Sequence, residues 1–334
     1  MKKFICILMA LAMILACVGC AAKQAEPAAE PAAEPADEYA TWPNQSIAIV
    51  VNYGAGGGTD LTTRVLAAAL EEELGVSIVI ENVAGGEGAT GLSRLLTAEP
   101  DGYTFGTGTG SNLTVLPNTS SECPYDPFED FEWVASYGEW TYGLWCAKST
   151  GLETFEDFIA YVESNPNEII YTGSGLFQVL LMEQIPLAMG KELAWSYLPN
   201  TSAAEALTTA LRGDAQVFPG TIQDLKGNDA DFNLLCNFSP NAITGFEETP
   251  TLEELGVTSS PVRNWLGLLA PAGTPEPILE KLRTAISNVM EDPALVESMS
   301  ASMDPVYMAG PDFREACLGI SNIVATLVEG GISY

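Results

Sequence analysis

The chain has 334 residues, of which 44 are acidic and 13 are basic, so its formal net charge is −31. This balance excludes nucleic acid as a partner, because contacts to phosphate need clustered lysine and arginine side chains. Histidine is absent from the sequence, which removes Ser-His-Asp and Cys-His catalysis and most transition-metal sites.

The cysteines that follow residue 20 are far apart and have no Cys-x-x-Cys spacing. We therefore expect no metal site, no redox motif and no cofactor. An exported protein can form disulfides, and the sequence leaves open whether these cysteines do so. They are Cys123, Cys146, Cys236 and Cys317.

The first twenty residues have the features of a secretory leader. Two lysines follow Met1, an apolar run covers residues 4–18, and Gly19 precedes Cys20. A cysteine after a small residue at this point is typical of a lipoprotein signal peptide, so residues 1–20 are predicted to be one. Lipidated Cys20 would anchor the protein to the membrane surface. Cys17 stays an alternative lipidation site. A second alternative is a leader that is cleaved without any lipidation.

Residues 21–41 are rich in alanine, proline and glutamate and repeat Glu-Pro-Ala-Ala with small variations. This composition buries too little apolar surface to fold, so we expect a disordered tether. A tether suits an anchored protein because it lifts the folded body off the membrane. The residues that remain are enough for two domains of ordinary size.

The folded part is predicted to begin with a strand, a glycine turn and a helix. Residues 47–51 are an unbroken apolar run, as in a parallel strand covered on both faces. Three glycines occupy residues 56–58, and the helix is expected to begin near Leu61, capped by Thr59 or Asp60. Amides at a helix N-terminus suit an anion, so this turn is predicted to hold a carboxylate. The competing interpretation is a tight connection without a ligand; a P-loop is excluded because no lysine follows the glycines.

The next elements continue this alternation. Strands are predicted at residues 77–81 and 103–107, with a helix between them that follows a second glycine turn at residues 85–88. Alternating strands and helices imply an α/β fold with a parallel sheet. The third strand is expected to run into a polar loop at residues 108–112, on the edge where open α/β sheets bind ligands.

The second half of the chain repeats this design. A strand at residues 169–172 ends in Gly173-Ser174-Gly175 and enters an apolar helix. Thr274 is expected to cap a later helix whose first residue is Pro275. Further strands are predicted at residues 142–147, 193–198, 215–220, 232–238 and 265–270, and the last helix at residues 313–329.

Several motifs together resemble one family. Their order and spacing, from Trp42 to the end of the chain, are similar to those of the solute-binding proteins of tripartite tricarboxylate transporters, often called the Bug family. The most specific motifs are Gly56-Gly57-Gly58-Thr59-Asp60 and the run from Gly267 to Pro275. The others are Trp42-Pro43, Glu81-Asn82, Gly85-Gly86, Pro100-Asp101-Gly102-Tyr103-Thr104 and Pro124-Tyr125-Asp126-Pro127.

The resemblance implies a two-lobed periplasmic-binding-protein-like fold of type II, with a ligand cleft between two α/β domains. It assigns residues 42–142 and 262–334 to lobe 1 and residues 143–261 to lobe 2. In such proteins one loop from each lobe holds a ligand carboxylate through backbone amides. The matching residues are Gly57, Gly58, Thr59 and Asp60 in lobe 1 and Thr172, Gly173, Ser174 and Gly175 in lobe 2, while Tyr53, Ser111, Asn112, Asn200 and Thr201 would line the cleft.

Taken together, these features predict a binding protein and not an enzyme. It would act outside the cytoplasm as a lipid-anchored monomer and deliver a small carboxylate to the membrane permease subunits of such a transporter. Basic residues are scattered along the chain, which favours a mono- or dicarboxylate. The alternatives are a sensor or adaptor for a membrane receptor and, more remotely, an exported α/β hydrolase using Ser174, although the chain has no histidine to activate that serine.

Overall fold

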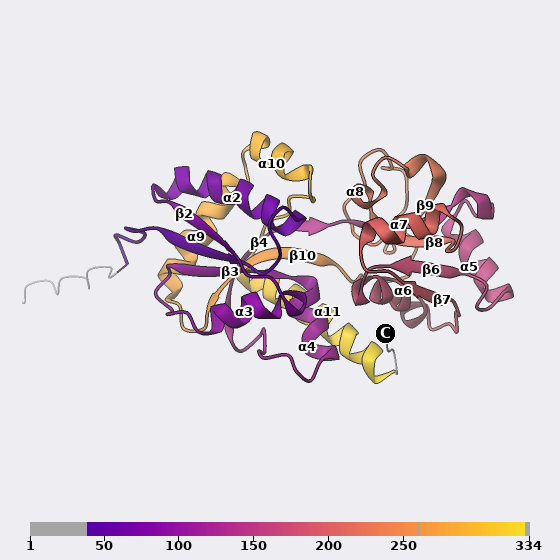
Figure 1. The fold of residues 1–334 in the computed structure, drawn as a ribbon, viewed down its shortest axis with the longest axis horizontal. Helices are drawn as coiled ribbons and strands as arrows, with labels where there is room; N and C mark the ends of the chain where they lie inside the picture. Colours follow the sequence, from indigo (N-terminus) through magenta and orange to yellow (C-terminus); the bar gives the residue numbers. More distant parts are fainter. Residues whose placement is uncertain (1–38, 259–260, 331–334) are drawn as a thin grey trace, which may run out of the picture. The chain divides into compact units, whose positions relative to one another are not determined.

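The computed structural model describes residues 39–258 and 261–330 (Figure 1). The predicted signal peptide, with Cys20 and Cys17, and most of the predicted tether lie outside the described residues. Contacts divide the chain into Met1–Thr41 and one compact unit, Trp42–Tyr334, which contains all the described helices and strands.

The first sheet has six strands in the order β11-β4-β10-β3-β1-β2. The first three strands of the chain, β1, β2 and β3, are parallel, as the alternation of strands and helices predicted. β10 lies antiparallel between β3 and β4, and all its residues are buried, as expected for a central strand. The sheet is therefore mixed. Its strands are β1 Ile47–Val51, β2 Ile78–Asn82, β3 Thr104–Thr109, β4 Phe131–Trp140, β10 Asn264–Pro271 and β11 Met308–Ala309.

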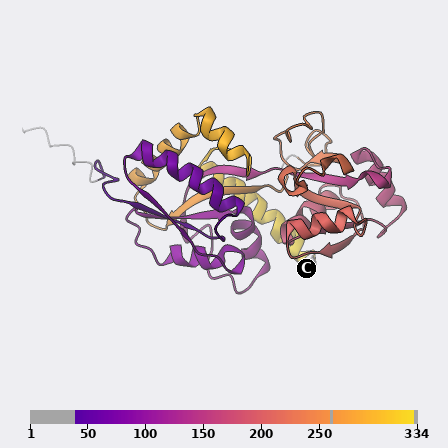
Figure 2. The same ribbon diagram turned by 45° about the horizontal axis from the view of Figure 1, so that its top comes forward.

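Helices cover both faces of this sheet, with α2, α9 and α10 on one face and α3, α4 and α11 on the other (Figures 1 and 2). α9 shows why such helices pack here. Its buried side chains Ile278, Leu282 and Ile286 are four residues apart and form one apolar stripe. The helices are α2 Gly58–Leu74, α3 Ala89–Leu96, α4 Leu116–Thr119, α9 Glu276–Val289, α10 Pro293–Ser300 and α11 Gly310–Glu329, with short turns η1 Gly86–Gly88 and η2 Ser111–Val115.

The second sheet has five strands in the order β7-β6-β8-β5-β9. β6 is parallel to β7 and β8, whereas β5 is antiparallel to β8 and β9. Its strands are β5 Tyr142–Ala147, β6 Ile170–Gly173, β7 Ser196–Pro199, β8 Val217–Thr221 and β9 Phe232–Asn237. Its helices are α5 Phe155–Ser164, α6 Leu176–Met189, α7 Ala203–Leu211 and α8 Ile222–Leu225, with short turns η3 Lys148–Thr150 and η4 Asp229–Asp231.

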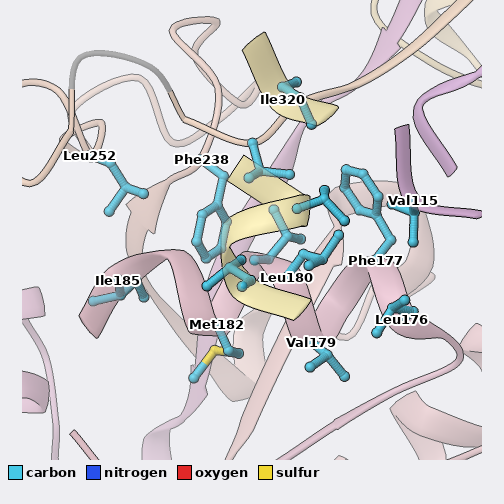
Figure 3. Close-up of a cluster of buried hydrophobic side chains, with 14 of the residues drawn as sticks. Val115, Leu176, Phe177, Val179, Leu180, Met182, Ile185, Phe238, Leu252 and Ile320 are labelled. Carbon is cyan, nitrogen blue, oxygen red and sulfur yellow. The ribbon is translucent and has the colours of Figure 1, made fainter. Parts of the chain in front are cut away.

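The largest apolar cluster joins residues of both sheets. Figure 3 shows it around α6, where Phe177 and Leu180 lie near Ile320 of α11 and Phe238, the residue after β9. Nine of the fourteen residues of α6 are buried, so this helix is apolar on more than one side. A helix of this kind is stable only when neighbouring elements cover it, and α11 supplies part of that cover.

Three predictions of local structure are wrong. α2 begins at Gly58 and not near Leu61, because Gly57 is the N-cap and neither Thr59 nor Asp60 caps the helix. The expected polar loop at residues 108–112 is instead the end of β3 followed by the π-helical turn η2. Thr274 does not cap α9, since its hydroxyl donates backwards to the Pro271 carbonyl at 2.8 Å.

The described residues include four cysteines. Cys123, Cys146, Cys236 and Cys317 are all free thiols. In the part of the chain that the structure describes, every helix is too short or too polar to cross a membrane.

Candidate functional site

The glycine turn after β1 ends at the N-terminus of α2. Gly56 has φ of 83°, a left-handed conformation that glycine adopts at little cost. The amides of Gly58, Thr59 and Asp60 have no acceptor among the described residues, as expected for the first turn of a helix. These amides are available to an anion, and the predicted binding of a carboxylate at this turn stays a prediction.

The carboxylate of Asp60 already occupies part of this N-terminus. It accepts from the Gly56 amide at 2.8 Å and from Asn82 at 2.9 Å, and it forms an ion pair with Arg64 at 2.9 Å. Burial raises the pKa of this carboxyl, but the hydrogen bonds from Arg64 and Gly56 outweigh it, so the net shift of the pKa is downward. The side chain of Asp60 is thus held by its own chain and stabilises the turn.

The glycine turn after β6 ends at the N-terminus of α6. Gly175 is the N-cap, so no side chain caps this helix. The first turn of the helix contains no acidic residue. A Cβ at Gly173 would lie 2.6 Å from the Gln178 side chain, so only glycine fits there. Among the described residues the amides of Leu176 and Phe177 have no acceptor, so none of those residues occupies this N-terminus.

A cavity of about 260 Å³ lies against the N-terminus of α6. Its wall combines turns that follow strands of the first sheet with β5 and the start of α6 beside the second sheet. Its lining residues are Tyr53, Glu87, Ser111, Val115, Tyr142, Ser174, Gly175, Leu176, Phe177 and Gln178.

Four of the predicted site residues line this cavity: Tyr53, Ser111, Ser174 and Gly175. The prediction missed Glu87 and the first turn of α6. A signal for both was present in the sequence, since Glu87 stands between glycines and residues 176–178 directly follow Gly173-Ser174-Gly175. The predicted residues that do not line it are Gly57, Gly58, Thr59, Asp60, Asn112, Thr172, Gly173, Asn200 and Thr201.

The hydroxyl of Tyr53 is fixed by three neighbours. It donates to the Glu87 carbonyl at 3.2 Å, lies 3.1 Å from the Thr109 hydroxyl and accepts from Asn112 at 3.4 Å. Burial raises the pKa of Tyr53, and hydrogen bonds from Thr109 and Asn112 only partly oppose this, so the phenol stays protonated at neutral pH. Asn112 therefore helps to position the Tyr53 hydroxyl, because its amide group donates to it.

Thr172 of the predicted lobe 2 loop and the predicted cleft residues Asn200 and Thr201 form hydrogen bonds within their own part of the chain. The side chain of Asn200 donates to the hydroxyl of Thr172, which in turn donates to the Leu198 carbonyl at 2.9 Å. Thr201 donates through its amide and its hydroxyl to the Glu205 carboxylate at 2.8 and 2.6 Å. A role of these residues in ligand binding stays a prediction.

A second cavity, of about 290 Å³, is slightly larger but contains none of the predicted residues. The charged side chain of Arg263 in its wall is already paired with Glu139. Of these two cavities, only the smaller has an unpaired helix N-terminus in its wall, so it suits an anion better. Among the described residues, there is also no cluster of acidic or cysteine side chains that could hold a metal ion.

A family model and a curated relative both match most of this chain. The family model described as a tripartite tricarboxylate transporter family receptor matches residues 62–318. A Cupriavidus necator protein, called UPF0065 protein in gbd 5'region, is 29% identical over 284 residues, which are 82% of this chain and 84% of the relative.

Solved structures have the same fold. A TctC solute-binding protein from Polaromonas, crystallised without ligand, has a TM-score of 0.78 at 24% identity and covers 87% of this chain and 100% of its own. The R. palustris protein Rpa4515, solved with adipate, has a TM-score of 0.67 at 23% identity and covers 86% and 96%. The predicted α/β fold with two lobes is confirmed by these similarities.

Proposed function

The chain belongs to the tripartite tricarboxylate transporter family of receptors, and from this premise we propose that it captures a small carboxylate in the 260 Å³ cavity. The family consists of extracytoplasmic solute-binding proteins and not of enzymes. Binding, and not bond-making, is then the chemistry that the site must perform.

The observation that carries the proposal is the uncapped N-terminus of α6 in the cavity wall. The amides of Leu176 and Phe177 have no partner among the described residues, and the helix dipole adds positive potential at this end. A carboxylate placed there would accept hydrogen bonds that contribute on the order of 1.5–3 kcal/mol each, because the acceptor is charged.

The N-terminus of α2 is the second anchor in this proposal. Its free amides, at Gly58, Thr59 and Asp60, are in α2, which packs on the first sheet, and they do not line the cavity. A ligand that engages both helix N-termini would favour a closed arrangement of the lobes over an open one. We place the lobe boundaries at residues 142 and 262, next to the two points where the chain passes between the sheets.

The cavity also supports a limit on the size and charge of the ligand. No lysine or arginine is among its lining residues. Additional carboxylates would be buried there without a cationic partner, which is costly. A monocarboxylate or a dicarboxylate therefore suits the site better than a tricarboxylate, and Rpa4515, solved with adipate, is an example of the second kind.

Anchoring and delivery complete the proposal. The leader supports lipidation of Cys20, with residues 21–41 as the tether. The family supports delivery of the bound carboxylate to the membrane subunits of a tripartite transporter.

Isothermal titration of the purified protein tests the proposal. Adipate, malate and a set of monocarboxylates are the probes, with citrate as the tricarboxylate control. We expect saturable heat with at least one mono- or dicarboxylate and a weaker response to citrate. If none of these acids gives heat or raises the unfolding temperature, the protein is not a carboxylate receptor.

A further inference from the structure

The chain passes between the two sheets twice, at residues 140–142 and at residues 261–264. We call these two segments the crossings. They meet where β10 pairs with β4, since Asn264 lies opposite Trp140 and Trp265 lies opposite Glu139. A change in the arrangement of the two sheets therefore has to move the backbone of both crossings together.

A buried ion pair joins the crossings. Arg263 donates through Nε to one oxygen of the Glu139 carboxylate at 2.8 Å and through Nη2 to the other oxygen. The Glu139 side chain is fully buried, and the guanidinium of Arg263 lies over the ring of Trp265, 4.9 Å from the ring centroid. Because a buried charge that loses its partner is very costly, this pair holds the two crossings together as one element.

Glu139 is also bound from both sheets. Its backbone exchanges hydrogen bonds with the backbone of Asp304, which precedes β11 of the first sheet, at 2.8 and 2.9 Å. Its carboxylate accepts at 3.2 Å from the side-chain amide of Asn241, in the segment that follows β9 of the second sheet. The Asn241–Glu139 hydrogen bond therefore links the two sheets beside the crossings.

Polar atoms of the crossings lack partners in this arrangement. Among the described residues, six buried side-chain polar atoms have no hydrogen-bond partner, and three of them belong to Thr141, Asn264 and Trp265. An atom of this kind costs free energy, and buried polar groups in folded proteins are otherwise nearly always paired. The crossings are thus a place that the present arrangement does not fully satisfy.

A cavity of about 290 Å³ lies beside the crossings. Ser239 and Pro240, which follow β9, contribute to its wall together with Arg263, Trp265 and Ile320. A close-packed interior resists displacement, whereas side chains next to a cavity can change place without compressing their neighbours. The crossings therefore have room to move.

From these observations we propose that Asn241 and the Glu139–Arg263 pair form a latch that holds the lobes open and thereby limits how tightly the carboxylate binds. This inference rests on the proposed function, in which one ligand engages the N-termini of both α2 and α6. The arrangement described here is open in that sense, because the free amides of α2 do not line the 260 Å³ cavity. Closure has to break the Asn241–Glu139 hydrogen bond, since this bond spans the two sheets.

The latch has a consequence that a purely structural contact does not have. The apparent affinity of a ligand is reduced in proportion to the fraction of protein in the binding arrangement. Removing a contact that only the open arrangement makes raises the closed fraction, so the variant binds more tightly. Loss of a contact that both arrangements share leaves the affinity unchanged or lowers it.

Asn241→Ala tests the latch, because it removes the hydrogen bond to Glu139 and leaves the buried ion pair in place. Asn241 is half-buried, so its truncation leaves no large hole in the core. In isothermal titration with adipate, malate and the monocarboxylates, any acid that binds the wild type should bind the variant about 3- to 10-fold more tightly. Without ligand, small-angle X-ray scattering should give the variant a smaller radius of gyration than the wild type.

Asn288→Ala is the matched control. Asn288 of α9 also donates to a glutamate, Glu73 of α2, at 2.7 Å, but both helices pack on the first sheet. This control should leave the affinity and the radius of gyration at their wild-type values.

The outcomes separate the latch from the proposed function. If Asn241→Ala keeps the wild-type radius of gyration, or becomes more compact without binding any acid more tightly, the latch is wrong and carboxylate binding still holds. If no acid binds either protein, the proposed function is wrong. The scattering then decides alone whether Asn241 holds the lobes open, since an unchanged radius contradicts this and a smaller one supports it.

Discussion

Two glycine turns that look equivalent in the sequence have different environments in the structure. Both follow a parallel strand and lead into a helix, α2 in one case and α6 in the other. The N-terminus of α2 contains the carboxylate of Asp60, bound to the Gly56 amide and to Arg64. The N-terminus of α6 contains no acidic residue and lies in the wall of a cavity.

The difference shows that a glycine turn before a helix is not by itself an anion site. At α2 the chain supplies its own anion, which competes with any ligand for the positive end of the helix. The first amides are unpaired among the described residues at both helices, but at α6 no carboxylate of the first turn lies beside them. We therefore expect α6 to contribute more to binding and α2 more to stability.

The largest effect is expected when one amide of α6 is removed. Leu176 is the first residue of the helix, a position that accepts proline because its amide has no partner within the helix. Leu176→Pro should weaken carboxylate binding by about 10- to 100-fold, since a hydrogen bond to a charged group contributes on the order of 1.5–3 kcal/mol. Leu176→Ala keeps the amide and is the matched control in the titration. Equal affinities of the two variants would show that α6 does not hold the carboxylate.

At α2 the main effect should be on stability. Asp60→Asn places an amide group against the Gly56 amide and the Arg64 guanidinium, where only acceptors fit. We expect the free energy of unfolding to fall by about 1–2 kcal/mol, measured by denaturant titration at neutral pH. Carboxylate affinity should not fall. A variant with wild-type stability and weaker binding would contradict the division of roles between the two turns.

The pH dependence of unfolding tests whether the charge of Asp60 is the source of this stability. Because the pKa of Asp60 is lowered in the folded state, its contribution to stability is present above the ordinary carboxyl pKa of about 4. It is lost as the pH falls through the folded-state value. The difference in stability between wild type and Asp60→Asn should thus be largest near neutral pH and shrink in acid. A difference that grows below pH 4 would show that the carboxylate is not stabilised by folding.

The smallest effect is expected when an amide of α2 is removed. Gly58 is the first residue of that helix, and a Cβ there would lie 3.6 Å from Trp140, an ordinary contact. Gly58→Pro should weaken binding by less than about tenfold, because Asp60 already shares this N-terminus. Gly58→Ala is its control in the same titration. A loss as large as that of Leu176→Pro would mean that both turns grip the ligand equally.

Local patterns predicted the parallel strands β1, β2 and β3 and most of the helices, because alternating apolar runs and glycine turns report directly on strands and connections. They did not predict β4, whose ten residues include charged and polar side chains. Nor did they predict that β10 inserts antiparallel between β3 and β4, because pairing between strands more than 100 residues apart leaves no local signal.

Of the predicted site residues, Tyr53, Ser111, Ser174 and Gly175 line the cavity, whereas the sequence did not predict that Glu87 and the first turn of α6 line it as well. Glycine patterns point to the turns themselves, whereas the helix residues that follow carry the free amides. Glu87 was missed because it belongs to a different glycine turn, which only the folded chain brings next to α6.

The sequence by itself determined the family and the α/β class, since these depend on composition and on short motifs. Only the tertiary structure decided which of two similar helix N-termini lies in the wall of a cavity and which one has a carboxylate of the chain beside it. The physical reason is that an amide or a carboxylate is available to a ligand only when no other group of the folded chain has satisfied it, and those partners come from distant parts of the sequence.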